Sequence, residues 1–319
     1  MNTILVPLDG SALAEQVLPY VRTLAPLLGV GVRLLNVISD ETHDSLLAEG
    51  IAASYGVIDP LATQREREHR SLTTRTHHAE GYLDSHAMLL RGQGIDVETD
   101  VRWGPAPDLI VEAAEGLDIT MIAMATHGYS GLRRWALGSV TDKVLHATAT
   151  PVFVVRGSKP APVDPVTFER VMVPLDGSPM AAQALPLAAD LAERAQAELL
   201  LMQAVEVSID AYPSIAPLGR PDLMPSEVLR MLRLRAGQQL EAQATMLRKR
   251  GLHVVSHVLN GHAAEAIIDE ATQRPVDLLV MATHGYSGLK RWALGSVTDK
   301  VLHAATTPLL LVRATASAN

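Results

Sequence analysis

Met124–Ala147 reads MATHGYSGLRRWALGSVTDKVLHA, and Met281–Ala304 repeats it as MATHGYSGLKRWALGSVTDKVLHA. The two copies differ only where Arg133 corresponds to Lys290, whereas the sequence around them has diverged widely. A hydrophobic core requires apolar side chains of suitable volume, so packing alone rarely fixes glycines, histidines and serines together. Either the duplication is recent or each copy carries a site, and the divergence of the flanking sequence favours a site.

The first copy predicts a strand, a glycine-rich loop and a helix. Ile119–Met124 is a short apolar run, typical of a strand buried on both faces. Glycine permits positive φ and a close approach of ligand to backbone, and the glycines here are Gly128, Gly131 and Gly138. Ser139 is predicted to cap the next helix, with Asp142 three residues on as in a capping box. N–H groups at a helix N-terminus bind anions, so this arrangement predicts a phosphate site.

The composition excludes several classes of protein. The chain has 319 residues, enough for two domains, and no cysteine, so it has neither disulfides nor thiolate metal sites. Its net charge of -8 argues against nucleic-acid binding. No apolar run reaches the roughly 18 residues of a membrane span. The N-terminal segment MNTILVPLDGS lacks the layout of a signal peptide, so we expect a cytoplasmic protein.

Working outward, each half is predicted to hold five strands that alternate with helices. In the first half the strands are Thr3–Leu8, Val32–Val37, Ile95–Val101, Ile119–Met124 and Pro151–Val155. In the second half they are Val171–Leu175, Leu199–Val205, His253–Leu259, Val276–Met281 and Pro308–Val312. The predicted helices of the first half follow Ser11, run from about Leu61 to Leu90, span Ala106–Ala114 and begin at Ser139. We expect domains at 1–156 and 170–319, joined by a proline-rich linker at 157–169.

This alternation predicts an α/β fold with two tandem, doubly wound parallel sheets of strand order 3-2-1-4-5. Ligands bind such sheets at the carboxyl ends of the strands, where the strand order reverses. Asp9 and Gly128 are then expected to face each other across one crevice, and Asp176 and Gly285 across another. The second copy is ten residues shorter, since its aspartate lies 167 positions after Asp9 (176 − 9) and its glycine 157 after Gly128 (285 − 128). That loss lies in the variable crossover after the second strand.

These residues resemble the universal stress protein family in its tandem form, along nearly the whole chain. ATP-binding members of that family carry a small residue, two others, Gly, nine others, then Gly-Ser or Gly-Thr. Here the pattern falls on Ala125, Gly128 and Gly138-Ser139, and on Ala282, Gly285 and Gly295-Ser296. The first position is usually Gly, so alanine in both copies is a departure that alters how the backbone meets the ligand. The resemblance implies a fold like that of the adenine-nucleotide alpha-hydrolases.

The resemblance also implies which residues hold ATP. The triphosphate would bind Gly128 N–H, Gly138 N–H, Ser139 and Val140 N–H, with adenine and ribose framed by Pro7, Leu8, Asp9 and Val37. Met124, Ala125, His127 and Gly131 complete the first set. The second set is Pro174, Leu175, Asp176, Ala204, Met281, Ala282, His284, Gly285, Gly288, Gly295, Ser296 and Val297. Ala204 offers less apolar area than Val37, so the two sites are expected to differ in affinity.

Further expectations concern ions and partners. A Mg²⁺ ion would bridge the phosphates through water and one aspartate. The family's fifth strands pair edge to edge, so Pro151–Val155 and Pro308–Val312 would pair within the chain and cover two exposed edges. We also expect a homodimer of tandem chains and an unidentified signalling partner.

Several residues allow a second interpretation. Asp9 and Asp176 would serve equally as caps of the first helix. His127 and His284 would act as general bases or only brace the loop. The basic residues of the loop would neutralise phosphate or face solvent, namely Arg133, Arg134, Lys290 and Arg291. His69, His77, His78 and His86 have no compact ligand spacing, and the second half lacks them, so we predict no metal site.

Two functions therefore remain open. The favoured one is a non-catalytic ATP-binding module in stress response or signalling, because no catalytic base, P-loop lysine or set of Mg²⁺ carboxylates is visible. The alternative is a slow ATPase, an autophosphorylating enzyme or a nucleotidyl transferase on the same fold, since fold alone does not decide function.

Overall fold

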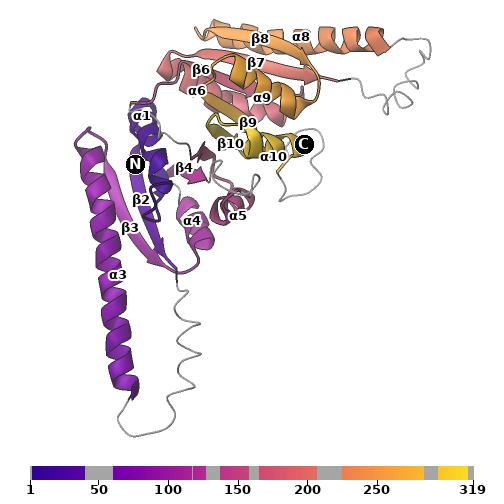
Figure 1. Ribbon diagram of the computed structural model, residues 1–319. Helices are drawn as coiled ribbons and strands as arrows, with labels where there is room; N and C mark the ends of the chain where they lie inside the picture. The colour runs from indigo at the N-terminus through magenta and orange to yellow at the C-terminus, as the bar shows by residue number, and fades with distance from the viewer. Residues whose placement is uncertain are drawn as a thin grey trace. The chain divides into compact units, whose positions relative to one another are not determined.

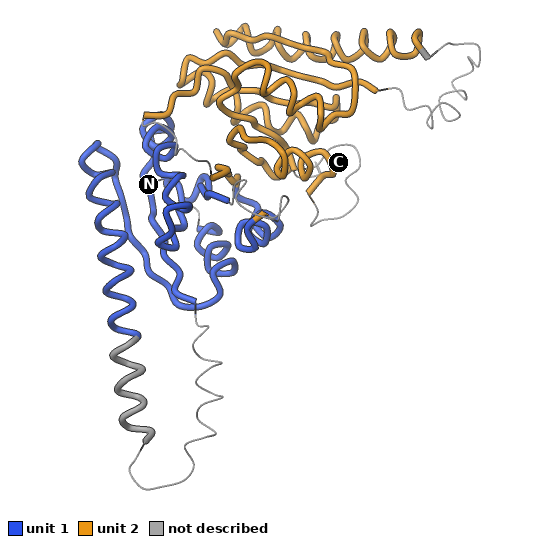
Figure 2. Tube along the Cα trace, viewed as in Figure 1, with its two compact units in different colours: residues 1–126, 138–150 blue, residues 127–137, 151–319 orange. Residues whose placement is uncertain are grey.

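The computed structural model describes residues 2–39, 60–116, 118–126, 137–157, 165–206, 225–283 and 294–314, without the side chains of 60–71 and 225. Two compact units divide the chain (Figure 2). Unit 1 contains the described residues of 1–126 and 138–150, and unit 2 contains Leu137 and the described residues from Pro151 onward.

Unit 1 is a parallel sheet covered by helices (Figure 1). Its strands have the order β3-β2-β1-β4, and every pairing among them is parallel. The strands are β1 (Thr3–Pro7), β2 (Gly31–Ile38), β3 (Val97–Trp103) and β4 (Ile119–Thr126). The helices are η1 (Ala14–Val17), α1 (Leu18–Leu28), α3 (Pro60–Arg91), α4 (Ala106–Ala114) and α5 (Ser139–Ala147).

Unit 2 repeats this architecture with strand order β8-β7-β6-β9-β10, which is the predicted 3-2-1-4-5. Its strands are β6 (Arg170–Pro174), β7 (Glu198–Val205), β8 (Val254–Asn260), β9 (Leu278–Ala282) and β10 (Leu309–Val312). Its helices are η2 (Ala181–Ala184), α6 (Leu185–Ala195), α8 (Pro225–Lys249), α9 (Ala263–Gln273) and α10 (Ser296–Ala304). The predicted α/β fold with parallel sheets is thus confirmed.

Strand β5 (Val152–Arg156) belongs to the first half by sequence but packs in unit 2. It runs antiparallel to β10, with Phe153 opposite Leu310 and Val154 opposite Leu309. The Arg156 guanidinium adds a 3.3 Å hydrogen bond to the carbonyl of Ala305. The expected pairing of the two fifth strands within the chain is therefore confirmed. The division between the two compact units falls before β5.

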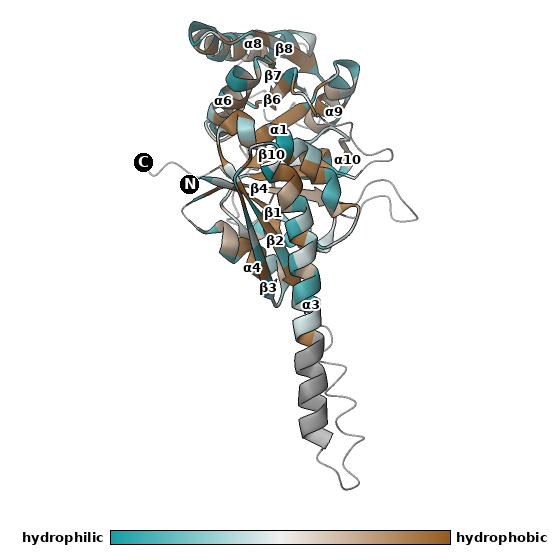
Figure 3. Cartoon of the chain, turned by 90° about the vertical axis from the view of Figure 1, so that its left-hand side faces the viewer, coloured by the Kyte–Doolittle hydropathy of each residue, from teal (hydrophilic) through white to brown (hydrophobic). Residues whose placement is uncertain are grey.

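The helices show how the local sequence sets element boundaries. Helix α1 ends at Gly29, whose φ of 68° lets its N–H bond the carbonyl of Ala25, as expected of a glycine stop. The long crossover helix α3 begins at Pro60 and ends at Arg91, close to the predicted Leu61–Leu90. Figure 3 shows hydrophilic and hydrophobic residues mixed along it, as suits a helix that packs one face on β2 and β3.

The pairing of β6 creates the opening that holds the candidate site. β6 is paired with β7 at five positions, as far as Pro174 with Met202. It is paired with β9 at two, Val171 with Leu278 and Met172 with Leu279. The carboxyl ends of β6 and β9 therefore separate, and a crevice opens where the strand order reverses.

Replacing Phe153 by alanine tests the β5–β10 pairing. The Phe153 side chain is fully buried, so Phe153→Ala should lower the free energy of unfolding by about 3–5 kcal/mol through lost transfer energy and a cavity. Urea denaturation measures this loss. Leu234→Ala is the control, since Leu234 is 62% exposed and its truncation should change stability by less than about 0.5 kcal/mol. Equal effects of the two substitutions would show that β5 is not packed as described.

Candidate functional site

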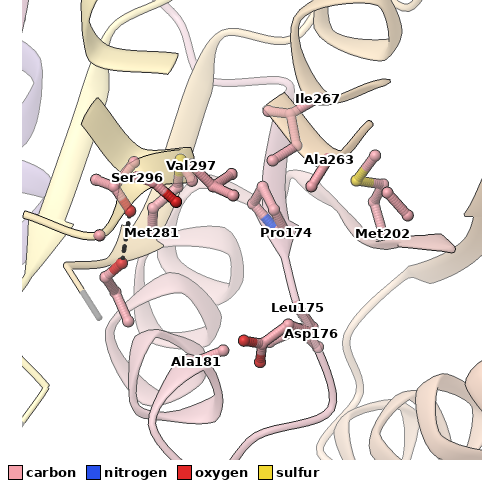
Figure 4. A pocket seen from close by; sticks show the side chains of 14 residues that line it. Pro174, Leu175, Asp176, Ala181, Met202, Ala263, Ile267, Met281, Ser296 and Val297 are labelled. Carbon is pink, nitrogen blue, oxygen red and sulfur yellow. Dashed lines mark hydrogen bonds between the residues drawn. The ribbon is translucent and has the colours of Figure 1, made fainter. Parts of the chain in front are cut away.

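A cavity of about 230 Å³ lies in unit 2 at the carboxyl ends of β6, β7 and β9 (Figure 4). Nine of the residues predicted for the second site line it: Pro174, Leu175, Asp176, Ala204, Met281, Ala282, Gly295, Ser296 and Val297. Five more lining residues were not predicted: Ala181, Met202, Ala263, Ile267 and Thr298. The structure thus brings together segments from both ends of the second half.

A hydrogen-bonded turn places Asp176 at one end of the cavity. The Leu175 N–H donates to the carbonyl of Met202 over 2.7 Å, which extends the β6–β7 pairing by one residue. Asp176 Oδ1 then accepts the N–H of Ser178 over 2.9 Å, and Ser178 Oγ accepts the N–H of Ala181 over 3.0 Å. Asp176 is therefore both a brace of the turn into η2 and a lining residue, so the two interpretations of this aspartate are compatible.

The first half builds the same turn. The Leu8 N–H donates to the carbonyl of Leu35 over 2.8 Å, and Asp9 Oδ1 accepts the N–H of Ser11 over 2.9 Å. Ser11 Oγ accepts the N–H of Ala14 over 3.1 Å. Pro7 ends β1, and Val37 lies near the end of β2, so the described residues of the first site occupy matching positions.

The start of helix α10 forms another side of the cavity, and it corrects the predicted cap. Gly295, not Ser296, is the N-cap, with φ −61° and ψ 145°, and Ser296 is the first helical residue. Gly138 and Ser139 stand in the same relation at α5. The Gly138 carbonyl accepts the first intrahelical bond, from the N–H of Asp142, and since glycine has no side chain, no side chain caps either helix. The capping box predicted for Ser139 and Asp142 is therefore wrong.

The glycine N–H groups also differ from expectation. The N–H of Gly138 donates to Thr126 Oγ1 over 3.0 Å, and that of Gly295 donates to the carbonyl of Thr283 over 2.6 Å. Both glycine N–H groups are therefore already hydrogen-bonded within the protein and are not available to bind a phosphate. Both residues have negative φ, so the positive φ suggested for Gly138 is also wrong. The N–H groups before the first intrahelical donor, Asp299, lack intrahelical acceptors, which leaves Ser296, Val297 and Thr298 as the backbone donors at this end.

Polar residues of helix α3 lie beside the Asp9 turn in the first half. The Tyr82 hydroxyl donates to Glu15 Oε1 over 3.1 Å, and His86 Nε2 lies 3.4 Å from the same oxygen. Burial, reinforced by the carboxylates of Glu15 and Asp9, raises the pKa of Tyr82 above its ordinary value. In the second half the corresponding contact is made by Gln239, whose side chain lies against Gly177. The surroundings of the two aspartates therefore differ.

Some predicted residues lie outside the described part of the chain, and their roles stay predictions: His127, Gly128, Gly131, His284, Gly285 and Gly288. Met124 and Ala125 are on β4, and Val140 is in the first turn of α5. Among the described residues, no three His, Cys, Asp or Glu side chains are placed to hold a metal ion. Nor does any helix in the described ranges have the length and apolarity to cross a membrane.

Three of the five unpredicted lining residues could have been found from the sequence. Met202 is two positions before Ala204, so it lies on the same face of β7. Ala263 and Ile267 are four apart on α9 and share one helix face. Ala263 begins the helix that corresponds to the predicted Ala106–Ala114. What the sequence did not show is that this helix begins beside β7.

Two glycine substitutions test the geometry of the turn. Gly10 and Gly177 have φ of +84° and +80°, which alanine adopts at a cost of about 1–2 kcal/mol. A Cβ at Gly10 would meet nothing within 4 Å, whereas at Gly177 it would lie 2.8 Å from Gln239 Oε1. Gly177→Ala should therefore destabilise the protein more than Gly10→Ala in thermal unfolding. Adding Gln239→Ala should remove the difference, and a larger loss from Gly10→Ala would contradict the described contact.

The chain is similar to known proteins along its whole length. The universal stress protein family matches residues 1–156 and again 167–313. A universal stress protein of Mycolicibacterium smegmatis is 26% identical over 310 residues, covering 97% of this chain and 96% of that protein. One from Synechocystis is 24% identical over 319 residues, covering 98% of this chain and 100% of that protein. The crystal structure of a universal stress protein from Archaeoglobus fulgidus, at 22% identity, covers 98% of both chains with a TM-score of 0.67 and so shares the fold. Because the family matches both halves, the chain belongs to the universal stress protein family as a tandem member.

Proposed function

We propose that the protein is an ATP-binding module without catalytic activity, with one nucleotide site in each half. The observation that carries this proposal is the second-half cavity, where an apolar wall, a carboxylate and a helix N-terminus meet. An adenine nucleotide needs these three environments for its base, its ribose and its phosphates.

The lining residues divide among these roles. Figure 4 shows Met202, Ala263 and Ile267 together on one side of Pro174, with Ser296 on the other and Asp176 at a third position. The apolar group is suited to an aromatic base. Asp176 would accept hydrogen bonds from ribose hydroxyls. The N–H groups of Ser296 and Val297, at the positive end of α10, would bind phosphate.

The size of the cavity agrees with partial enclosure of the nucleotide. Its volume of about 230 Å³ is below the roughly 300–1,000 Å³ of pockets that enclose drug-sized ligands. It would accommodate the base and sugar and would leave the phosphates at the helix end. A Mg²⁺ ion on those phosphates belongs to the proposal, and Asp176 is the carboxylate that the described lining offers to it.

The described lining favours binding over catalysis. It includes one carboxylate, Asp176, and no histidine, lysine or arginine, and no hydrogen bond is described between Asp176 and the hydroxyl of Ser296 or Thr298 that would activate a nucleophile. The homodimer, the signalling partner and the cytoplasmic location also belong to the proposal. ATP occupancy would control the contact with that partner. Sedimentation with and without ATP tests the homodimer.

Charge placed at the helix N-terminus tests the proposed phosphate site. Ser296→Asp puts a carboxylate where the phosphates would bind, and at about 4 Å two unit charges repel by about 4 kcal/mol at an effective dielectric constant of 20. Second-site affinity should fall by about 100- to 1,000-fold. The helix should be stable, because an acidic residue in the first turn is favourable. Calorimetry should show two ATP per parent chain and one per Ser296→Asp chain.

Matched variants make this test specific. Asparagine has the size of aspartate without its charge, so Ser296→Asn should retain two ATP sites per chain. Ser139→Asp should remove only the first-half site. Unchanged stoichiometry in both aspartate variants would refute phosphate binding at these helices. ATP recovered intact after long incubation supports the module, whereas accumulation of ADP would support the enzyme alternative.

A further inference from the structure

A histidine–glutamate pair adjoins, in sequence, two residues that line the second-half cavity. Glu206 follows β7, two residues after the lining residue Ala204, and His262 is the N-cap of α9, directly before the lining residue Ala263. His262 Nδ1 lies 2.8 Å from Glu206 Oε2. The pair therefore joins the strand wall and the helix wall of the apolar side of the cavity.

The fold itself does not require this pair. In the second half the Gly261 N–H donates to the carbonyl of Val205 over 3.0 Å. The first half forms the same backbone bond from Gly104 to Ile38 over 3.1 Å, yet Pro105 is its N-cap where the second half has His262. Ser39 follows Ile38 as Glu206 follows Val205. The same backbone thus forms with and without the ion pair.

Stability is also a weak reason for the pair. The side chains of His262 and Glu206 are 68% and 39% exposed. Ion pairs between exposed side chains contribute little to folding, because water screens them and ordering the side chains costs entropy. A role toward a ligand is the better account of a pair found in one half only and placed beside a cavity.

The chemistry of the wall indicates what such a pair would contact. Met202, Ala204, Ala263 and Ile267 offer apolar atoms but no side-chain hydrogen-bonding groups to an aromatic ring. A base inserted between β7 and α9 would have its polar edge at the rim. An ionised carboxylate only accepts hydrogen bonds, so it favours an edge that donates and disfavours one that accepts.

We propose that Glu206, positioned by His262, selects a base with an exocyclic amino group at the second site. This inference rests on the proposed nucleotide binding and adds a specificity determinant that the first half lacks. The amino group of adenine would donate to the Glu206 carboxylate. Inosine triphosphate carries a carbonyl oxygen in place of that amino group, so at this position two acceptors would face each other, and Glu206 could accept from the neighbouring N1–H only if the base shifted.

Competition between ATP and inosine triphosphate tests this inference in the full chain. Ser139→Asp is used as the background, so that binding reports the second site. ATP should bind about 10- to 100-fold more tightly than inosine triphosphate, as expected for one hydrogen bond to a charged group. Glu206→Gln supplies an amide that both donates and accepts. It should therefore weaken ATP and strengthen inosine triphosphate, and bring the ratio near one.

Further variants distinguish a direct contact between Glu206 and the base from an effect of net charge. Glu265→Gln removes the same charge from an exposed residue on α9 and should leave the ratio unchanged. His262→Ala should lower the ratio without lowering the melting temperature, and His262→Gln, which keeps a donor for Glu206, should restore part of it.

Three other results would contradict the specificity role of Glu206. If Glu206→Gln leaves both affinities unchanged while ATP still binds, the specificity role is refuted and nucleotide binding stands. An equal effect of Glu265→Gln would attribute the change to net charge and refute the contact. If the parent chain binds neither nucleotide, the proposed function fails and the inference fails with it.

Discussion

The second-half site depends on the point where β6 leaves β9 but stays with β7. In a parallel sheet the backbone groups of neighbouring strands satisfy one another, so strands separate only where other partners replace the ladder. Those partners are present beyond Met172. The Leu175 N–H bonds the Met202 carbonyl, the Gly295 N–H bonds the Thr283 carbonyl, and Thr298 Oγ1 donates to the Ala282 carbonyl over 3.1 Å. The crevice is therefore formed by the hydrogen-bonded backbone, and the side chains determine only the chemistry of its surface.

The two halves share this backbone but surround it with different side chains. The aspartate turn, its positive-φ glycine and the glycine before the last helix recur with nearly the same hydrogen bonds. Around them, Tyr82 and Glu15 adjoin the first turn, whereas Gln239 adjoins the second. The backbone geometry of the aspartate turn is therefore common to both halves, whereas the side chains around it differ.

The sequence predicted the strands and much of the site because apolar runs and turn residues are local signals. Asp176, Ser296 and Ala204 line one cavity because each lies close to the end of a strand or at the start of a helix on the carboxyl edge of the sheet. The prediction that Ser139 caps its helix was wrong by one position. A serine that is the first helical residue after a glycine N-cap gives the same sequence pattern as a serine N-cap. Contacts between distant segments were also missed. Nothing near Glu206 in sequence indicates that His262 lies 2.8 Å away, since only the folded sheet brings them together.

The antiparallel pairing of β5 with β10 has a consequence during synthesis. Arg156 and Ala305, which are joined across this pairing, are 149 positions apart, so β5 leaves the ribosome long before its partner exists. At roughly 5–20 residues per second the interval lasts about 7–30 seconds. Throughout it, the apolar run Val152-Phe153-Val154-Val155 lacks its partner strand β10, and unpaired apolar segments of this kind tend to associate with other chains. The tandem arrangement thereby replaces a permanent exposed edge with a temporary one, whose lifetime depends on the rate of translation and the length of the second half.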